Sequence, residues 1–208
     1  MRRAAEAEPA ISPALPAARE AARKAIHAAA GTAAALVAWL LPPLPARALL
    51  AAAALFALAV DLIRLRVPGA DRRFRLAVGA MLRPAERRGL TGATTLALGA
   101  ALTALIFPGR VAAIGILYAA IGDASAALVG SRLGRRTYRP GRTVEGTLAF
   151  FAAALAIGYA APGTGLPAAA AAALAVTLVE AAPVPIDDNV SIPVAGAAAY
   201  RLAIWLAG

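Results

Sequence analysis

The stretch "AAIGDASAALVGSRLGRRTYRPGRTVEGTLAF", residues 119–150, places the carboxylate of Asp123 inside a run that otherwise reads as a membrane-spanning helix. Five arginines and Glu145 follow it. A charged side chain at the centre of a bilayer costs roughly 2.5–3.5 kcal/mol on insertion scales, so Asp123 is expected to have a partner or a function. The stretch therefore predicts a membrane helix that contains a paired or functional aspartate and is followed by a basic loop.

The composition of the whole chain indicates a polytopic membrane protein. Of its 208 residues, 61% are hydrophobic, and the mean hydropathy of +0.72 is too high for an ordinary soluble domain. The chain has no cysteine, which excludes a disulfide framework and a thiolate metal site. Its net charge of +10 is gathered in a few connecting segments, a pattern typical of membrane topology signals. We therefore expect no nucleic-acid partner.

Apolar segments along the chain predict an all-α, polytopic transmembrane helix bundle of about seven spans. They cover residues 25–41, 46–63, 92–107, 111–130, 147–161, 167–182 and 190–207. Several are short against the roughly 20 residues that span a bilayer, and alanine dominates them, so closely packed helices are expected. Residues 1–22 hold no long apolar run and are expected to form a flexible tail, with residues 23–208 as a single membrane domain.

The distribution of arginine predicts the orientation of the chain in the membrane. The connecting segments 64–91 and 131–146 carry eight and five arginines, whereas the segments that alternate with them carry one or none. The positive-inside rule places the N-terminus and both basic segments in the cytoplasm, which implies an inner-membrane protein whose site faces the cytoplasm. Apolar residues at helical spacing within 64–91 fit a helix lying on the membrane surface, and an ordinary basic loop fits equally well.

Two further acids lie at the edges of predicted spans. Asp61 is expected to pair with Arg64, its i+3 neighbour on a helix, whereas Glu180 has no basic residue near it in sequence. The loop after Asp123 combines four glycines with its five arginines, which offers mobile backbone amides and positive charge to a phosphate group. A topology signal alone has no use for Glu145 at the entrance to the next span, so Glu145 favours a binding role for the loop.

The segment "PIDDNVSIP", residues 185–193, starts the last predicted span with two adjacent carboxylates, Asp187 and Asp188, and an amide, Asn189. Oxygen ligands of this kind suit Mg²⁺, which usually carries the phosphates of a substrate. Acids and amides are equally common at the N-terminus of a helix, where they cap backbone amides and face the positive end of the dipole. Both interpretations stand for this segment.

The rarest polar residues of the chain are not scattered. Against twenty arginines the chain has one lysine, Lys24, one histidine, His27, and one asparagine, Asn189. Lys24 and His27 are three residues apart, so a helix places them on one face at the cytoplasmic entrance of the first span. A lysine kept among so many arginines indicates a need for a compact ammonium group.

Five motifs follow one another from residue 23 to about residue 195, over nearly the whole chain. They are "RKAIHAAAG" (23–31), "LTGATTLALG" (90–99), "GDASAALVGSRLGRR" (122–136), "GRTVEGTLAF" (141–150) and "DDNVSIP" (187–193). In this order they resemble the motifs of the dolichol kinase, phytol kinase and CTP-dependent diacylglycerol kinase family of integral membrane lipid kinases. Relatives typically carry Lys-Ser-x-Glu-Gly where this chain has "RTVEG", and arginine in place of lysine changes the geometry of a phosphate contact.

The resemblance implies transfer of a phosphoryl group from a nucleoside triphosphate, usually CTP, to the hydroxyl of a polyprenol, a phytol-like alcohol or diacylglycerol, with Mg²⁺ as cofactor. It implies catalytic roles for Lys24, His27, Asp123 and Glu145, nucleotide contacts from Arg135, Arg136, Gly141, Arg142, Thr143 and Gly146, and a metal site at Asp123, Asp187, Asp188 and Asn189. Asp123 would be either a metal ligand or the base that receives the proton of the lipid hydroxyl.

Two other functions fit the same residues. A phosphatidate cytidylyltransferase also uses CTP, Mg²⁺ and a membrane lipid, but it leaves a CDP-lipid and pyrophosphate in place of a phosphorylated lipid and CDP. A small transporter could use Asp61, Asp123 and Glu180 as an ion path across the bilayer. The polar motifs are predicted to gather at one face of the membrane, which favours an enzyme.

Overall fold

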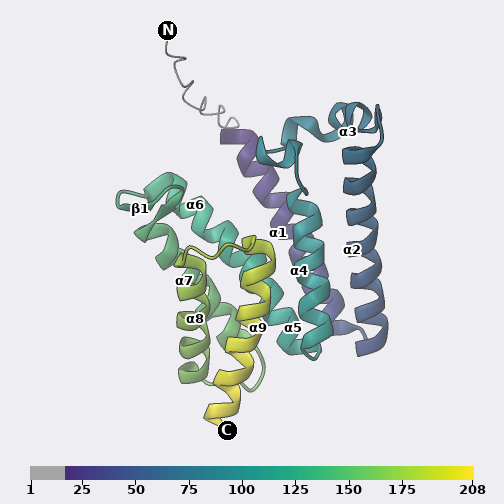
Figure 1. Ribbon diagram of the computed structural model, residues 1–208. Coiled ribbons are helices and arrows are strands. Elements are labelled where there is room, and N and C mark those ends of the chain that lie inside the picture. Colours follow the sequence, from purple (N-terminus) through teal and green to yellow (C-terminus); the bar gives the residue numbers. More distant parts are fainter. Residues whose placement is uncertain (1–16) are drawn as a thin grey trace, which may run out of the picture.

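The computed structural model describes residues 17–208, which fold almost wholly into helices (Figure 1). The α-helices are α1 (Ala17–Leu40), α2 (Pro43–Arg66), α3 (Ala70–Val78), α4 (Gly92–Ile106), α5 (Gly109–Leu117), α6 (Asp123–Leu133), α7 (Val144–Ala160), α8 (Leu166–Ala181) and α9 (Asp188–Ala207). Shorter elements are the 3₁₀ turns η1 (Gly79–Met81) and η2 (Ala85–Arg87), the π-helical turn η3 (Tyr118–Gly122), and the strands β1 (Thr137–Arg139) and β2 (Arg142–Thr143). The predicted all-helical class is confirmed, with a helix at every predicted apolar segment.

Three helical stretches of the described residues are long and apolar enough to cross a membrane: α2, the continuous run from Gly109 to Leu133, and α9. Helices α4, α7 and α8 are apolar but shorter, at 15 to 17 residues. These helices support membrane association, while the number of spans and their orientation stay predictions. Helix α1 begins at Ala17, so residues 17–22 of the predicted tail are helical, and the rest of that tail lies outside the described residues.

The bundle has two apolar clusters that share α5. One joins α5, α7, α8 and α9 around Tyr118, Phe150 and Tyr200, which are fully buried. The other joins α1, α2, α4 and α5, and consists of alanines with Leu50 and Ile116. Because small side chains let helix backbones approach one another, the alanine-rich composition produces a tightly packed bundle, as predicted.

The start of α9 lies against α4 and α5 through glycines. A Cβ atom at Gly99 would overlap the carbonyl oxygen of Asn189, and one at Gly115 would overlap the carbonyl oxygen of Pro193. Only glycine permits backbones to come this close. This contact fixes where Asn189 lies relative to α4.

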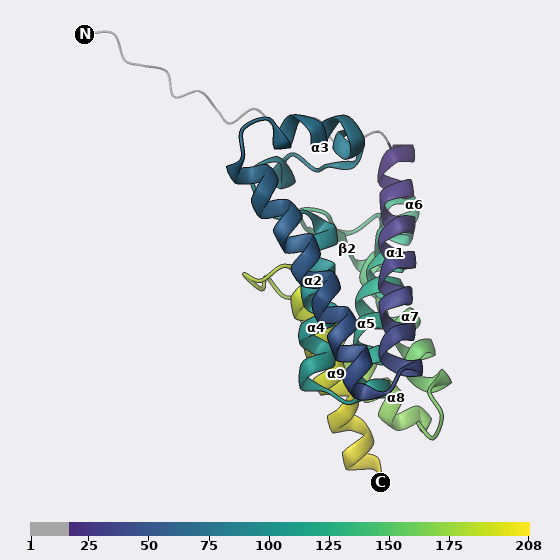
Figure 2. The same cartoon turned by 90° about the vertical axis from the view of Figure 1, so that its right-hand side faces the viewer.

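Helix α3 crosses one end of the bundle, roughly perpendicular to α2 (Figures 1 and 2). It is held there by Arg64, whose guanidinium lies 5.0 Å from the ring centroid of Phe74 and donates to the carbonyl oxygens of Glu86 and Gly89. The same guanidinium donates to Asp61 at 2.5 Å, which confirms the predicted i,i+3 pair. Part of segment 64–91, Ala70–Val78, is therefore helical, and its position on the membrane surface stays a prediction.

Candidate functional site

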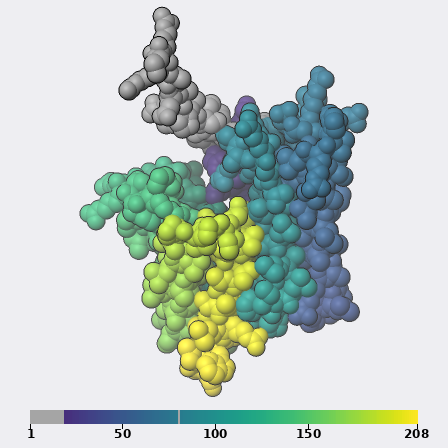
Figure 3. Space-filling model, viewed as in Figure 1, coloured from purple at the N-terminus to yellow at the C-terminus, as the bar shows by residue number. Residues whose placement is uncertain are grey.

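A cavity of about 700 Å³ opens at the end of the bundle where α3 lies, and it is called the main cavity below. Figure 3 shows a recess there between the segment that contains β1 and β2, in green, and the α3–α4 region, in teal and blue. Its walls come from α1, α6, the two strands, the first turn of α7, the last turn of α8 and the start of α9. Segments far apart in sequence therefore build one site.

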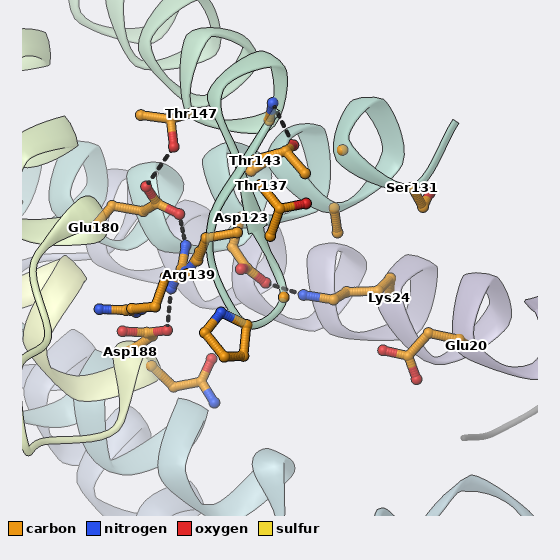
Figure 4. Close-up of a pocket in the computed structure, with 18 of the residues that line it drawn as sticks. Glu20, Lys24, Asp123, Ser131, Thr137, Arg139, Thr143, Thr147, Glu180 and Asp188 are labelled. Atoms are coloured by element: carbon orange, nitrogen blue, oxygen red, sulfur yellow. Dashed lines mark hydrogen bonds and ion pairs between the residues drawn. The ribbon is translucent and has the colours of Figure 1, made fainter. Parts of the chain in front are cut away.

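Asp123 lies in the wall of the main cavity as the first residue of α6, directly after the π-helical turn η3. π-Helical turns inside α-helices are rare, and those that occur often lie at functional sites. The ammonium group of Lys24, on α1, forms an ion pair with the Asp123 carboxylate, and both side chains remain about one-fifth exposed (Figure 4). The expected partner of the unusual carboxylate is thus the single lysine of the chain, and the pair reduces the cost of a charge in an apolar helix.

Arg142 links three parts of the cavity wall. Its guanidinium donates to the Asp188 carboxylate on α9 at 2.5 Å and forms a second ion pair with Glu180 on α8. Glu180 is only 1% exposed, so it needs a compensating charge, and Arg142 supplies it from 38 positions earlier in the chain. Glu180 has no basic partner near it in sequence, and its partner in the structure is the distant Arg142.

The basic loop that the sequence suggested to be mobile is an ordered hairpin. Strands β1 and β2 pair across the turn Arg139-Pro140-Gly141-Arg142, and Gly141 has a φ of 76°. A type II turn requires a positive φ at its third position, usually supplied by glycine, and proline is common at its second position. This turn brings Arg139 and Arg142 to the main cavity.

Thr143 and Gly146 shape the N-terminus of α7, which lies beside the main cavity. The hydroxyl of Thr143 caps the helix by accepting from the Gly146 N–H at 3.1 Å. A Cβ atom at Gly146 would lie 2.9 Å from the carbonyl oxygen of Ala126, so Gly146 permits the close approach of α6 and α7. A helix N-terminus favours anions because its amides and dipole present positive charge.

The start of α9 combines a cap with an amide bridge. Asp187 accepts from the Asn189 N–H at 2.9 Å, so the capping interpretation holds for Asp187. The Asn189 side chain joins α9 to α1 through His27, at 2.8 Å, and to α4 through Thr95, at 2.9 Å. His27 lines a second space of about 180 Å³, the side cavity, which shares Lys24, Asp123 and Asn189 with the main cavity.

Most of the predicted site residues meet at the main cavity. Its lining includes Lys24, Asp123, Gly141, Arg142, Thr143, Gly146, Asp187, Asp188 and Asn189, and His27 joins through the side cavity. Arg135, Arg136 and Glu145 are not among the lining residues; both arginines are exposed, and Glu145, which is half-buried in the first turn of α7, accepts from the backbone N–H of Arg136. The three lie in the basic loop, but the hairpin turns them away from the cavity.

Other lining residues were not singled out from the sequence as site residues. They are Glu20, Arg83, Arg139, Thr147 and Glu180, with several small residues of α6. Hydrogen bonding to Arg23, together with the charge of Arg83, lowers the pKa of Glu20 from 4.5 to about 2, so Glu20 is ionised at neutral pH. No local pattern marks Glu20 or Arg83, because their contact joins α1 to the segment before α4.

The oxygen ligands predicted for Mg²⁺ are only partly brought together. Among residues 17–208 no group of three or more histidine, cysteine or acidic side chains could hold a metal ion. Asp187 caps α9, and Asn189 bridges α9 to α1 and α4. Asp123 and Asp188 line the main cavity, where each forms an ion pair with a basic side chain. Mg²⁺ is usually held by one or two carboxylates together with phosphate oxygens, and Asp123 and Asp188 fit that donor set.

The fold and the cavity define a helical protein in which three of the described helical stretches are long and apolar enough to cross a membrane, with a charged cavity at one end of the bundle. Neither a family model, nor a curated protein, nor a solved structure matches the chain.

Proposed function

We propose that the chain is an integral membrane lipid kinase, which transfers a phosphoryl group from a nucleoside triphosphate to the hydroxyl of a membrane lipid or prenol. The observation that supports it is the meeting of Lys24, Asp123, Arg142 and Asp188, from four separate segments, around one cavity of an otherwise apolar bundle (Figure 4). Phosphoryl transfer needs positioned groups and compensated charge more than covalent help from the protein, and this cavity offers both. The resemblance of the five motifs supports CTP as the donor.

The triphosphate would lie between the hairpin and α1. Arg139 and Arg142 supply fixed guanidinium groups there, Lys24 supplies an ammonium group, and the N-terminus of α7 supplies backbone amides. The volume of about 700 Å³ lies within the range of about 300–1,000 Å³ typical of small-molecule sites. By the positive-inside rule this end of the bundle faces the cytoplasm, where nucleoside triphosphates are available.

Asp123 is the group proposed to accept the proton of the lipid hydroxyl. It lines both the main cavity and the side cavity, so it lies where the acceptor and the phosphates would meet. The hydroxyl oxygen attacks the γ-phosphorus and forms a new P–O bond. The bond from that phosphorus to the bridging oxygen breaks, the nucleoside diphosphate leaves, and the hydroxyl proton passes to the Asp123 carboxylate. Lys24, the ion-pair partner of Asp123, is then beside the phosphate oxygens.

A carboxylate of the cavity wall could hold the metal that accompanies the nucleotide. Bound Mg²⁺ would neutralise phosphate charge, and Asp188 is the residue that could hold it while Asp123 accepts the proton. Arg142 positions Asp188 through their 2.5 Å hydrogen bond, and the buried Glu180 fixes Arg142 in turn. Arg142 therefore serves both the phosphates and the shape of the site.

The structure favours this proposal over an ion path through the bundle. Asp123 and Glu180 line the same cavity at one end, and Asp61 is bound to Arg64 and to Thr91. Three carboxylates along a transporter path would instead be spaced through the bundle and accessible to water.

The test is a product assay with the purified protein in nanodiscs. The protein is incubated with polyprenol, phytol or diacylglycerol and with each nucleoside triphosphate, and the products are identified by mass. A phosphorylated lipid and a nucleoside diphosphate are expected, and they should be absent from the same preparation carrying Asp123→Asn, which controls for contaminating kinases. A CDP-lipid with pyrophosphate would identify a cytidylyltransferase, and either that result or no product with any pair would overturn the proposal.

A further inference from the structure

An apolar groove of about 380 Å³ lies beneath α3, between α1, α2 and α4. Helices α1 and α2 meet at the far end of the bundle and diverge towards α3, as Figure 2 shows. The walls of the groove carry Ile26 and Ala30 from α1, Phe56 and Ala57 from α2, and Met81 from the turn after α3. Its volume is in the range of about 300–1,000 Å³ that holds small ligands.

The groove leads to Asp123. His27 lines both the groove and the side cavity, as do Arg23, Glu86 and Gly92. The side cavity in turn shares Lys24 and Asp123 with the main cavity. The three spaces therefore form a series that is apolar at α2 and charged at Asp123.

The outer wall of the groove faces the region that a bilayer would occupy. Phe56 is 72% exposed and belongs to α2, one of the helices apolar and long enough to cross a membrane. Ile26, on the opposite wall, is 57% exposed. Large apolar side chains exposed beside a groove favour a ligand that arrives from hydrocarbon, because water would oppose their exposure.

We propose that this groove binds one hydrocarbon chain of a lipid alcohol, which enters from the membrane between α1 and α2 and directs its hydroxyl past His27 to Asp123. That the bound alcohol is the phosphoryl acceptor rests on the function proposed above. The apolar walls of the groove suit a hydrocarbon chain, and the charged end near Asp123 suits the single hydroxyl group of the alcohol. Helix α3, held by Arg64, covers one end of the groove.

The test is photolabelling without nucleotide, so it does not depend on kinase activity. The probe is a hexadecanol that carries a diazirine in mid-chain, and the labelled positions are mapped by mass spectrometry. The label is expected on residues of the groove, and unlabelled hexadecanol should compete better than hexadecane because its hydroxyl reaches the polar end.

Ala30→Phe fills the groove from α1, where Ala30 is exposed enough to be enlarged without disturbing the core. Ala29→Phe is the matched control, because Ala29 is an exposed neighbour on the same helix that does not line the groove. Labelling should fall about tenfold in Ala30→Phe, as expected for overfilling a packed space, and stay at the wild-type level in Ala29→Phe.

Equal labelling of the two variants, or label spread over the lipid-facing surfaces, would overturn the proposal that the groove binds the alcohol. Competition by phospholipid but not by hexadecanol would also overturn it, because the occupant would then be a structural lipid. If the groove is labelled as expected and no phosphorylated lipid forms in the product assay, the proposed kinase function fails while the lipid-alcohol site stands.

Discussion

Asp61 and Asp123 are both aspartates in apolar helices, and both are paired with a cation, but their surroundings differ. The Asp61–Arg64 pair is local, almost fully buried at 1% and 2% exposure, and supplemented by hydrogen bonds from Thr91. The Asp123–Lys24 pair joins residues 99 positions apart, is 23% and 19% exposed, and borders the main cavity.

The difference separates a structural ion pair from one that can exchange partners. Asp61 ties α2 to the start of α4, and its pair is buried and held by hydrogen bonds to backbone and side-chain groups. Asp123 has one cation and an open side, so a ligand with its own charges can take part of that interaction. Buried pairs resist such exchange because separating them leaves an uncompensated charge.

Replacing Asp123 by asparagine is the sharpest way to test this comparison, and it has the largest expected effect. Asp123→Asn keeps the shape but removes the proton acceptor, so lipid phosphorylation should fall about 10²–10⁴-fold, the usual contribution of a positioned general base. The free energy of unfolding should change by less than about 1 kcal/mol, because the lost pair is partly solvated. Initial rates and thermal unfolding in the same nanodiscs measure the two quantities. Wild-type activity in this variant would remove Asp123 from the chemistry.

Asp61→Asn should show the opposite pattern. It removes the nearer of the two carboxylates around the buried Arg64 guanidinium and leaves Asp71 at 3.9 Å, so the free energy of unfolding should fall by about 3 kcal/mol, the lower end of the usual cost of breaking a buried ion pair. The rate per folded molecule should stay near that of the wild type. Denaturant unfolding, together with activity normalised to folded protein, checks this. A loss of turnover with unchanged stability would mean that Asp61 belongs to the site and that the two pairs do not differ as argued.

A third variant tests whether Lys24 acts through its compact ammonium. Lys24→Arg keeps the charge beside Asp123 but changes the geometry of its donors. The rate should fall about tenfold, equivalent to the loss of one charge-assisted hydrogen bond of about 1.5 kcal/mol, with little change in stability. Arg19→Lys, an exposed position on the same helix, is the control and should leave the rate unchanged. A Lys24→Arg enzyme as active as the control would show that only the charge matters.

The helices and the local ion pair could be predicted because their signals are local. Runs of apolar residues mark each long helix, and i,i+3 spacing marks Asp61 and Arg64. The sequence predicts a tail up to residue 22, whereas α1 begins at Ala17, because residues 17–22 are polar or small and carry no apolar signal. The helix there is supported by the Glu20–Arg23 pair and by Arg83. Charged residues at the end of a membrane helix carry no apolar signal.

The site was only partly predictable, because its contacts are long-range. The rarity of Lys24, His27 and Asn189 pointed to their importance, yet nothing in the sequence pairs Glu180 with Arg142. The Pro140-Gly141 dipeptide is a standard turn signal, and it is the local feature of the sequence that indicates a turn within this loop. Without that turn, Arg135 and Arg136 could not be told apart from Arg139 and Arg142.

The smallest expected effect concerns Glu20, which lines the main cavity and extends the comparison to a carboxylate that is more exposed than Asp61 and Asp123. Its pKa is lowered from 4.5 to about 2 by hydrogen bonding to Arg23 and by the charge of Arg83. A lowered pKa means that the stabilisation is complete above pH 4.5 and is lost as the pH falls towards 2. The Tm difference between wild type and Glu20→Gln should therefore shrink over that interval, and it should be small throughout because Glu20 is 38% exposed and solvent screens the pair. A Tm difference that is constant across the interval would show that the carboxylate charge does not contribute, and that the helical start of α1 depends on packing alone.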